Sequence, residues 1–460
     1  MDKRFPIEDQ ISMFSSAIKG RVVTPVDADY DAVRMVVLAN FDCRPRAVIR
    51  VANATDVTAV LNFAQATDLE IAIRSGGHSV GGFSGTDGGI VIDLRDLNGM
   101  AIDAEAKTAW CGAGLTAGDV TRAVEQHGLI VGFGDSASVG IGGLTLGGGI
   151  GYMVRKHGLT IDSLLAVEIV TAAGDIIVAD ATHHAELFWA LRGGGGNFGV
   201  VTRFKYRLHD LPSFVGGPLI LPAQPEVLAG FMAASAAAPE ELSAIAFVMP
   251  CPPMPFLPPA MHGQVVIIAM MAYAGDPAAA QAALAPFRAL ATPIVDLVRP
   301  APYSSLYIME PPPGLRDAVS CRSRFSNRLG VEEAATIIDR IQRSDAPMRM
   351  AQVRTLGGAF SRVGNGDTAF GHRNATVMTA FLAMYGSVAD QPHHDAWATE
   401  AMNAVAPGET GVYVNFLAQE GEARLHAAYP AGTWERLRQV KRRYDPENLF
   451  RLNQNIRPAS

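Results

Sequence analysis

The chain has 460 residues, of which 49% are hydrophobic and 18% are charged, with a net charge of −7. This length predicts more than one domain, because a single hydrophobic core rarely serves so long a chain. The negative charge argues against a surface that binds nucleic acid or an anionic membrane. No apolar run approaches the roughly 20 residues that cross a bilayer, and the polar, acidic start lacks the apolar stretch of a signal peptide. We therefore expect a cytoplasmic protein with no nucleic-acid or membrane partner.

From about residue 46 the chain alternates helical and strand patterns. Val57, Val60 and Leu61 follow helical spacing, with Asn53 or Thr55 available as a cap. Residues 201–208 alternate apolar and basic side chains, which is typical of a half-buried strand. The other predicted elements of this half are strands in 69–74 and 89–94, a helix in 116–127 and a hairpin in 164–180.

The composition changes in the second half of the chain. Residues 250–259 are rich in proline, which favours extended irregular structure over helices or central strands. The patterns then predict strands in 263–275, 348–358 and 373–385, a helix in 331–343 and a basic terminal helix in 433–450. Together they predict a second α+β unit, built on an antiparallel sheet.

Metal and disulfide sites are not expected. The four cysteines form no CxxC pair: Cys43, Cys111, Cys251 and Cys321. This scatter predicts neither a zinc site nor a disulfide framework. His183 and His184 have no third ligand at a suitable spacing, so we predict no metal.

Three glycine-dense loops dominate the first half: seven of the fourteen residues in 76–89, seven of the twelve in 140–151 and five of the seven in 193–199 are glycine. Glycine is costly in conformational entropy, so three such loops need a common explanation. Backbone N–H groups wrapped around a pyrophosphate would be one. A dinucleotide fingerprint would also fit the spacing of Gly194, Gly196 and Gly199, but that motif needs a strand before it and a helix after it. Here a helical pattern precedes and a strand pattern follows, so we reject it.

The ordered motifs RSGGHS, GLTLGGGIGYMVRKHGLTIDSLLAVEIVTAAGDI, ELFWALRGGGGNFGVVTRF and YDPENLFRLNQNIRP resemble those of the berberine-bridge-enzyme-like oxidases, within the vanillyl-alcohol-oxidase superfamily. The resemblance is close over 46–210 and 410–460 and looser between them. It implies an α+β fold, with an FAD-binding domain of two subdomains and an inserted α+β substrate domain on an antiparallel sheet. We expect the first part of the FAD domain in 1–214, the substrate domain in 215–410 and the rest of the FAD domain in 411–460.

The resemblance also implies a covalent bond between the FAD and His78. Such a bond fixes the flavin ring and raises its redox potential. Many relatives carry a second link from a cysteine, where this chain has Ser136, so we expect a single link. Val139 matches the position that gates oxygen, and a small side chain there is associated with oxidases. The remaining residues that we expect along the FAD are Arg74, whose fork suits phosphate, Ser75, Gly76, Gly77, Ser79, Gly140, Gly143, Gly148, Gly149 and Val201.

Two residues are candidates for catalysis. Tyr413 in GVYVNF resembles the family's active-site tyrosine, and a positive neighbour that lowered the pKa of its phenol would make it a base. Asn415 lies on the same face and would reach the flavin or hold the loop. Gln352 shares a strand face with Met350 and Arg354, a pattern that is typical either of a cavity wall or of a polar face turned to solvent.

We therefore expect an FAD-dependent oxidase, a monomer or homodimer. It takes a hydride from a CH–OH or CH–NH carbon of a small organic substrate, such as a secondary metabolite, cyclic amine or sugar, and O2 then reoxidises the flavin and yields H2O2. One alternative is a dehydrogenase or oxidative cyclase of the same fold that reacts poorly with oxygen. Another, of a different class, is a flavin-binding protein without catalysis.

Overall fold

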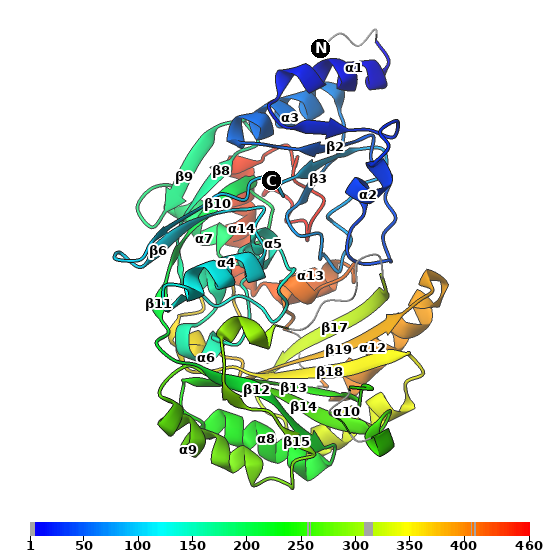
Figure 1. Ribbon diagram of the computed structural model, residues 1–460. Coiled ribbons are helices and arrows are strands. Elements are labelled where there is room, and N and C mark those ends of the chain that lie inside the picture. Colours follow the sequence, from blue (N-terminus) through cyan, green and yellow to red (C-terminus); the bar gives the residue numbers. More distant parts are fainter. Residues whose placement is uncertain (1–4, 255–256, 258, 308–315, 406, 409–410) are drawn as a thin grey trace.

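The computed structural model describes the whole chain except residues 1–4, 255–256, 258, 308–315, 406 and 409–410. Residue 410, at a predicted domain boundary, and Pro255 and Pro258 of the proline-rich run therefore lie outside the described residues. The described chain folds around two sheets in the upper half of Figure 1 and a larger sheet in its lower half. The C-terminal helix returns to the upper half.

The first sheet carries the strand that leads into the first glycine loop. Its strands, in spatial order, are β1 (Arg21–Val23), β2 (Ala47–Arg50), β4 (Ile90–Asp93) and β3 (Ile71–Arg74). The three that pair in parallel, β2, β4 and β3, are almost entirely buried, as expected for parallel strands that are covered on both faces. Helix α3 (Ala54–Thr67) begins where the Asn53 side chain accepts a hydrogen bond from the Asp56 amide. The predicted strands and helix of this region are confirmed.

The second sheet is antiparallel and has the order β5 (Met100–Asp103), β6 (Thr108–Gly112), β10 (Val200–Arg207), β8 (Leu164–Val170) and β9 (Ile176–Asp180). On β10, Phe204 and Tyr206 are buried and Arg203 is exposed, which confirms the predicted alternation. The third glycine loop follows helix α7 (Ala185–Leu191) and precedes β10. This helix–loop–strand order is the reverse of a dinucleotide fingerprint, so the rejection of that motif is confirmed.

The third sheet is antiparallel, as predicted, and separates the helices of the lower half from the upper half of the molecule. Its path is β15 (Val295–Asp296), β12 (Val215–Pro222), β14 (Val265–Tyr273), β13 (Leu242–Pro250), β18 (Met348–Thr355), β19 (Val377–Tyr385) and β17 (Ala318–Ser326), with β16 (Arg299–Pro300) beside β12. Helices α8 (Pro225–Ala237), α10 (Val331–Arg343) and α12 (Gln391–Val405) pack on one face around Val353 and Phe381. The opposite face carries Phe247 and Met378, which pack against residues of the first half of the chain.

Other described elements complete the two halves. The helices are α1 (Ile7–Phe14), α2 (Tyr30–Arg34), α4 (Ala117–Glu125), α5 (Ile141–Leu146), α6 (Val154–His157), α9 (Pro277–Arg288), α11 (Ala359–Arg362), α13 (Glu422–Ala428) and α14 (Ala431–Tyr444). Short 3₁₀ turns span Ser15–Ala17, Thr160–Asp162, Pro259–Met261, Tyr303–Leu306, Val388–Asp390 and Val414–Phe416. Strands β7 (Leu129–Ile130) and β11 (His209–Asp210) form a small pair.

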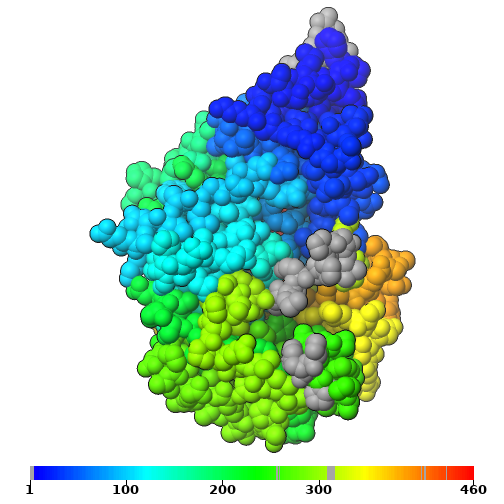
Figure 2. Space-filling model, in the orientation of Figure 1, coloured from blue at the N-terminus to red at the C-terminus, as the bar shows by residue number. Residues whose placement is uncertain are grey.

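The largest apolar cores mirror the predicted division of the chain. One joins residues between 11 and 208 to Ala369 and to residues between 412 and 456, and another lies between Val215 and Val405. Figure 2 shows the same separation on the surface, with the blue and cyan residues above the green and yellow ones. The division into two cores agrees with the predicted domain boundaries, whose exact positions stay a prediction. Among the described helices, none combines the length and apolarity that a membrane span requires.

A stacked histidine pair joins α6 to β11. The rings of His157 and His209 lie with centroids 4.0 Å apart and planes inclined by 13°. Burial, reinforced by the neighbouring His209, lowers the pKa of His157 to about 3, and burial also lowers the pKa of His209. Both rings are therefore neutral in the folded protein at neutral pH.

This pair predicts acid sensitivity. An unfolded histidine titrates near about pH 6.5, so the unfolded chain binds more protons than the folded one between that pH and the lowered folded pKa. The contribution of the two neutral rings to the free energy of unfolding is fully present above about pH 6.5. It is lost as the pH falls, by up to about 1.4 kcal/mol per pH unit for each ring. Denaturant unfolding at about pH 7.5 and about pH 5.5 should show a larger loss in the wild type than in His157→Phe, which keeps an aromatic stack. Equal losses in the two proteins would contradict this role.

Candidate functional site

The three glycine loops meet in the structure. The backbones at Gly76 and Gly140 lie so close that a Cβ on Gly76 would sit 2.3 Å from the Gly140 nitrogen. Ser75 Oγ bridges the same loops, because it donates to the Ala113 carbonyl (2.6 Å) and accepts from the Gly142 amide (3.3 Å). The third loop joins through the Gly193 and Gly195 amides, each 3.0 Å from the Leu146 carbonyl oxygen. Glycine is thus required here by close backbone approach.

The predicted attachment residue faces the segment that holds Ser136 and Val139. The His78 Nε2 atom lies 2.8 Å from Ser138 Oγ, and Ser138 directly precedes the half-buried Val139. The His78 loop is also tied to the C-terminal part of the chain, since Gln419 Nε2 donates to the Gly81 carbonyl (2.8 Å). Sequence reasoning missed Ser138, which lies 60 residues from His78.

This contact predicts that Ser138 positions the imidazole ring. The hydrogen bond to Nε2 fixes the orientation of the ring and so the direction of the other ring nitrogen. If His78 carries the flavin, as the resemblance implies, loss of one such bond should slow covalent flavin attachment by about 3- to 10-fold. The measurement is the fraction of chains that carry FAD during reconstitution of the apoprotein, for the wild type, Ser138→Ala and Ser138→Thr. Threonine should restore the rate, and an unchanged rate in the alanine variant would rule out the role.

Tyr413 sits on the second glycine loop. Its hydroxyl oxygen accepts hydrogen bonds from the Gly149 amide (2.9 Å) and from Asn415 Nδ2 (2.8 Å), and Asn415 also donates to the Leu144 carbonyl (3.0 Å). Gly148 and Gly149 have positive φ angles of 132° and 81°, which bring the loop against the ring. Asn415 thus holds the loop and the phenol together.

The protonation state of Tyr413 differs from the expectation. Burial raises the pKa of its phenol, and the hydrogen bonds from Gly149 and Asn415 and the positive charge of Arg354 offset this only in part. The lowered pKa that would make Tyr413 a base is not found, because the side chain is 4% exposed and desolvation of the phenolate outweighs the positive neighbour. The hydroxyl is therefore protonated at neutral pH and can donate a hydrogen bond.

The β18 strand adds a polar row on the face directed to the first half of the chain. Gln352 and Arg354 lie two residues apart on this face. Ser323 of β17 lies level with Gln352, because both residues pair with Ala380 of the intervening strand β19. All three side chains are buried. Gln352 Oε1, Ser323 Oγ and Arg354 Nε and Nη1 have no hydrogen-bond partner among the described residues. Because an unpaired buried polar group is costly, this row supports the predicted wall of a polar binding site.

Arg354 also joins the two halves of the chain. It pairs with Asp135, which lies 219 residues away just before Ser136, and its guanidinium is 5.3 Å from the ring centroid of Phe416. The charge of Asp135 also acts on Tyr152, whose phenol is buried and whose pKa is raised well above its usual value, mainly by burial. Sequence reasoning missed this pair, since no local pattern connects two residues so far apart.

The expected phosphate role of the Arg74 side chain was wrong. Its Nη2 atom lies 2.8 Å from Asp93 Oδ2, and its guanidinium also donates to the carbonyls of Val33 (2.7 Å) and Arg34 (2.9 Å). Arg74 and Asp93 are 2% and 0% exposed. The planar guanidinium is thus used inside the protein, where it joins β3 to β4 and to the C-terminal end of α2.

The other predicted cofactor residues lie on or beside the glycine loops. Gly77 has a φ of 76°, and Ser79 Oγ accepts from the Phe83 amide (3.3 Å). A Cβ on Gly143 would meet no described atom within 4 Å, so this position borders open space. Val201 is 3% exposed and belongs to the core around β10.

The C-terminal segment closes over the third glycine loop. Asn197 Oδ1 accepts from the Ile456 amide (2.9 Å), and Asn453 Nδ2 donates to the Gly196 carbonyl (3.2 Å). The Oδ1 atoms of Asn453 and Asn455 are buried with no partner among the described residues. These amides were missed by the sequence analysis, and they suit a polar cofactor next to the loops.

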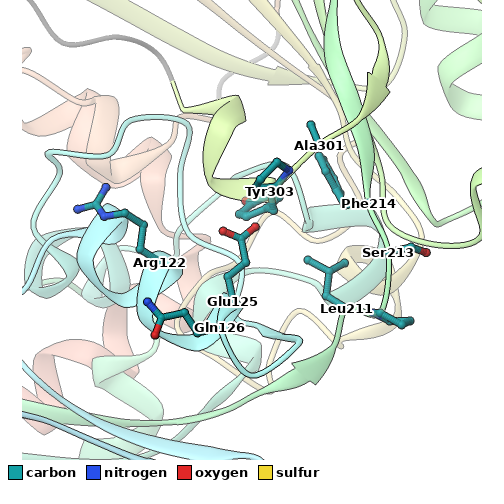
Figure 3. A pocket seen from close by; sticks show the side chains of 10 residues that line it. Arg122, Glu125, Gln126, Leu211, Ser213, Phe214, Ala301 and Tyr303 are labelled. Atoms are coloured by element: carbon teal, nitrogen blue, oxygen red, sulfur yellow. The ribbon is translucent and has the colours of Figure 1, made fainter.

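A separate pocket of about 360 Å³ lies where α4 meets the segments 211–214 and 301–303. Figure 3 shows Glu125 of α4 directed toward the stretch that carries Tyr303, and its carboxylate accepts from Ser304 Oγ (2.6 Å). Neither the glycine loops nor Tyr413, Gln352 or His78 line this pocket. It is therefore not part of the predicted site.

Comparison with known proteins agrees with this geometry. Residues 45–180 match the model of an FAD binding domain, and residues 412–457 match the model described as berberine and berberine like. The FAD-linked oxidoreductase YgaK of Bacillus subtilis is 30% identical over 457 residues, which cover 97% of this chain and 98% of that protein. (R)-6-hydroxynicotine oxidase of Paenarthrobacter nicotinovorans is 29% identical over 453 residues, covering 96% and 97% of the two chains.

Solved structures agree as well. The crystal structure of 6-hydroxy-D-nicotine oxidase from Arthrobacter nicotinovorans matches with a TM-score of 0.84 and 27% identity over 96% of this chain and 98% of that one. Xylooligosaccharide oxidase from Myceliophthora thermophila matches in fold, with a TM-score of 0.85 and 22% identity over 98% and 99% of the chains.

The fold and the sequence likeness thus define an FAD-linked oxidoreductase of the vanillyl-alcohol-oxidase fold class. The chain belongs to the berberine-bridge-enzyme-like family within it. The residues present fit FAD, because three glycine loops converge beside His78, and the buried amide oxygens of Asn453 and Asn455 have no hydrogen-bond partner within the part of the chain that the structure describes.

Proposed function

We propose that this protein is an FAD-dependent oxidase that takes a hydride from a carbon bonded to nitrogen or oxygen in a small organic substrate and passes the electrons to O2, giving H2O2. The observation that carries the proposal is the position of Tyr413. Its hydroxyl is fixed on the Gly148–Gly149 loop, and Arg354, in the same row as Gln352, lies close enough to act on its phenol. When bound, the flavin supplies the hydride acceptor.

Tyr413 is assigned the role of a hydrogen-bond donor. Its oxygen already accepts two N–H bonds, so its own O–H hydrogen is available for the nitrogen or oxygen of the substrate. This bond would orient the reacting C–H group, and correct orientation is a large part of catalysis. The Nε and Nη1 donors of Arg354 and the Oε1 atom of Gln352, which have no partner in the described chain, would hold the rest of the substrate.

A neutral phenol favours an amine over an alcohol as substrate. When the nitrogen of an amine is unprotonated, the C–H bond can break with both electrons leaving as hydride, and an iminium forms without removal of a proton. An alcohol needs a base for its O–H proton at the same step, and Tyr413 is not ionised at neutral pH. The likeness to (R)-6-hydroxynicotine oxidase, whose name denotes an amine-containing substrate, agrees with this preference.

The link to the cofactor is proposed to be single. His78 lies against Ser138, whereas Ser136 stands where many relatives of the family carry a second cysteine link, and a serine hydroxyl forms no thioether. The small side chain of Val139, next to Ser138, supports the oxidase assignment over a dehydrogenase.

The test is anaerobic mixing of the purified holoprotein with a panel of cyclic secondary amines and matched alcohols. We expect the amines to bleach the flavin absorbance, and air to restore it within seconds with equimolar H2O2. If reoxidation takes minutes, the protein is a dehydrogenase or an oxidative cyclase and not an oxidase. If dithionite bleaches the flavin but none of the amines or alcohols does, the protein binds flavin without catalysis.

A further inference from the structure

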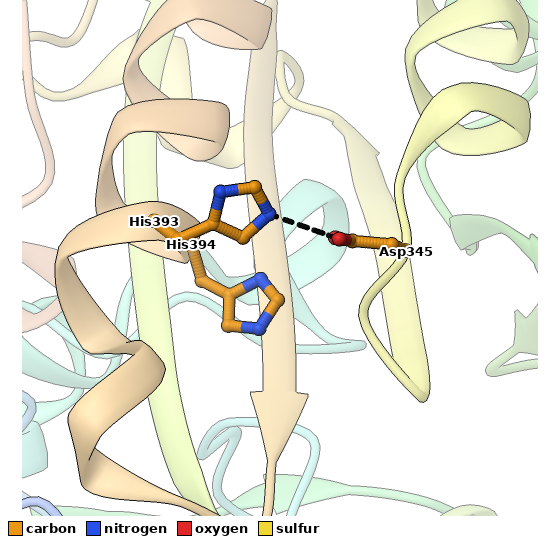
Figure 4. A group of neighbouring side chains, drawn as sticks. All are labelled: Asp345, His393 and His394. Atoms are coloured by element: carbon orange, nitrogen blue, oxygen red, sulfur yellow. Dashed lines mark hydrogen bonds and ion pairs between the residues drawn. The ribbon is translucent and has the colours of Figure 1, made fainter.

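A cluster of three metal-ligating side chains lies in the substrate half of the chain, away from the glycine loops. His393 and His394 are in the first turn of α12, and Asp345 is in the turn that leads into β18. Each offers one ligand atom, and these atoms all lie within 4.8 Å of one another. Figure 4 shows the three side chains converging from the helix and the turn.

Two of the ligand atoms already lie close to the separation found in a metal site. His393 Nε2 lies 3.0 Å from Asp345 Oδ1. In a tetrahedral zinc site with bonds of about 2.1 Å, neighbouring ligand atoms are about 3.4 Å apart. Asp345 supplies a carboxylate oxygen and His393 an imidazole nitrogen, and zinc binds both kinds of ligand.

His394 provides an independent observation. Its side chain is 4% exposed, and its Nδ1 atom is buried with no hydrogen-bond partner among the described residues. The ring is held by packing on Tyr385, with centroids 4.3 Å apart, and its centroid is 5.0 Å from that of His393. In Figure 4 one of its ring nitrogens is turned toward the His393–Asp345 pair. A buried imidazole nitrogen without a partner is costly unless an ion or a donor occupies the space beside it.

We propose that His393, His394 and Asp345 form a binding site for a divalent transition-metal ion of the zinc type, completed by water. The His394 ring is fixed by packing, whereas the side chains of His393 and Asp345 are 63% and 70% exposed and are able to turn. The largest separation has to shorten by about 1.4 Å to reach a tetrahedral edge. Two imidazoles and one carboxylate with an open fourth position suit zinc better than calcium or magnesium, which prefer oxygen ligands.

The bound ion would join two elements of the substrate half. It would link the start of α12 to the turn before β18, the strand that carries Gln352 and Arg354. The first turn of a helix is the positive end of its dipole, which disfavours a cation, so the negative charge of Asp345 is essential. The earlier expectation of no metal rested on the cysteines and on His183–His184, and it did not consider Asp345, which lies 48 residues from His393.

The experiment uses the full chain with its flavin and without an affinity tag, stripped with a chelator and titrated with Co²⁺ and Zn²⁺ alone. We expect one ion per chain, with visible absorbance of four-coordinate Co²⁺ that Zn²⁺ displaces, and a Tm that rises with metal concentration. His393→Gln and Asp345→Asn change exposed side chains and should weaken binding at least about 10-fold, the loss caused by even an outer-shell partner. His394→Phe keeps the packing on Tyr385 and should weaken binding as much.

The matched control is His183→Gln. His183 forms a similar exposed pair, with its Nδ1 atom 3.1 Å from Asp180 Oδ2. Because this pair is not part of the proposed three-ligand site, the His183→Gln protein should bind the metal as tightly as the wild type. The proposal is overturned if the wild type binds no ion at millimolar metal. It is equally overturned if the His394→Phe protein binds like the wild type, since an isolated His–Asp pair would then suffice.

Discussion

Replacement of Tyr413 with phenylalanine is expected to lower kcat/KM by about 10²- to 10³-fold, the usual effect of removing one fixed hydrogen-bond donor from a reacting centre. The ring would keep its contacts with Phe370 and Phe416, whose centroids lie 6.2 Å and 5.4 Å from that of Tyr413. The loss should therefore come from the hydroxyl and not from the fold. The measurement is steady-state turnover in air together with the rate of flavin reduction without oxygen.

The control is Tyr30→Phe. Tyr30 is a similarly buried tyrosine, 6% exposed, whose hydroxyl donates to the Pro45 carbonyl (2.6 Å) in a different core. Its replacement should leave kcat/KM within about 3-fold, as expected for a single hydrogen bond outside the site. Because the pKa of Tyr413 is raised, kcat/KM of the wild type should show no ionisation of this phenol between about pH 7 and pH 10. A base with a pKa near 7 that vanishes in Tyr413→Phe would contradict the donor role.

Replacement of His78 with alanine is expected to abolish retention of flavin by the denatured polypeptide. The three glycine loops and the C-terminal amides remain, so the native variant should still bind FAD reversibly. Its flavin should have a more negative midpoint potential, because the electron-withdrawing link is lost. Acid precipitation followed by absorbance of the pellet measures the first effect, and a redox titration of the native protein measures the second.

Ser136→Ala is the matched control for this variant. Ser136 lies on the segment that faces His78 but forms no expected bond to the cofactor, so its replacement should leave the flavin in the pellet. A colourless pellet from Ser136→Ala, or a coloured one from His78→Ala, would contradict the assignment of the link.

The elements that sequence predicted well are those with a local cause. The strands β3 and β4 are short apolar runs beside glycine, and the alternation of Phe204 and Tyr206 with Arg203 marks the half-buried β10. The convergence of the glycine loops followed from the need to explain so many glycines at once. In each case the pattern and its physical reason lie within a few residues of each other.

What sequence did not predict depends on distant contacts. The guanidinium of Arg74 was expected to bind phosphate, but it donates its hydrogen bonds to the carboxylate of Asp93 and to two backbone carbonyls. Arg354 and Asp135 meet across 219 residues. The protonation state of Tyr413 follows from its burial, which is a property of the folded chain and not of the motif around it.

The most direct test of the cofactor assignment is mass mapping of peptides from the denatured wild-type protein. The account predicts an FAD adduct on the peptide that contains His78 and an unmodified peptide that contains Ser136. An unmodified His78 peptide, or an adduct on any other residue, would contradict it.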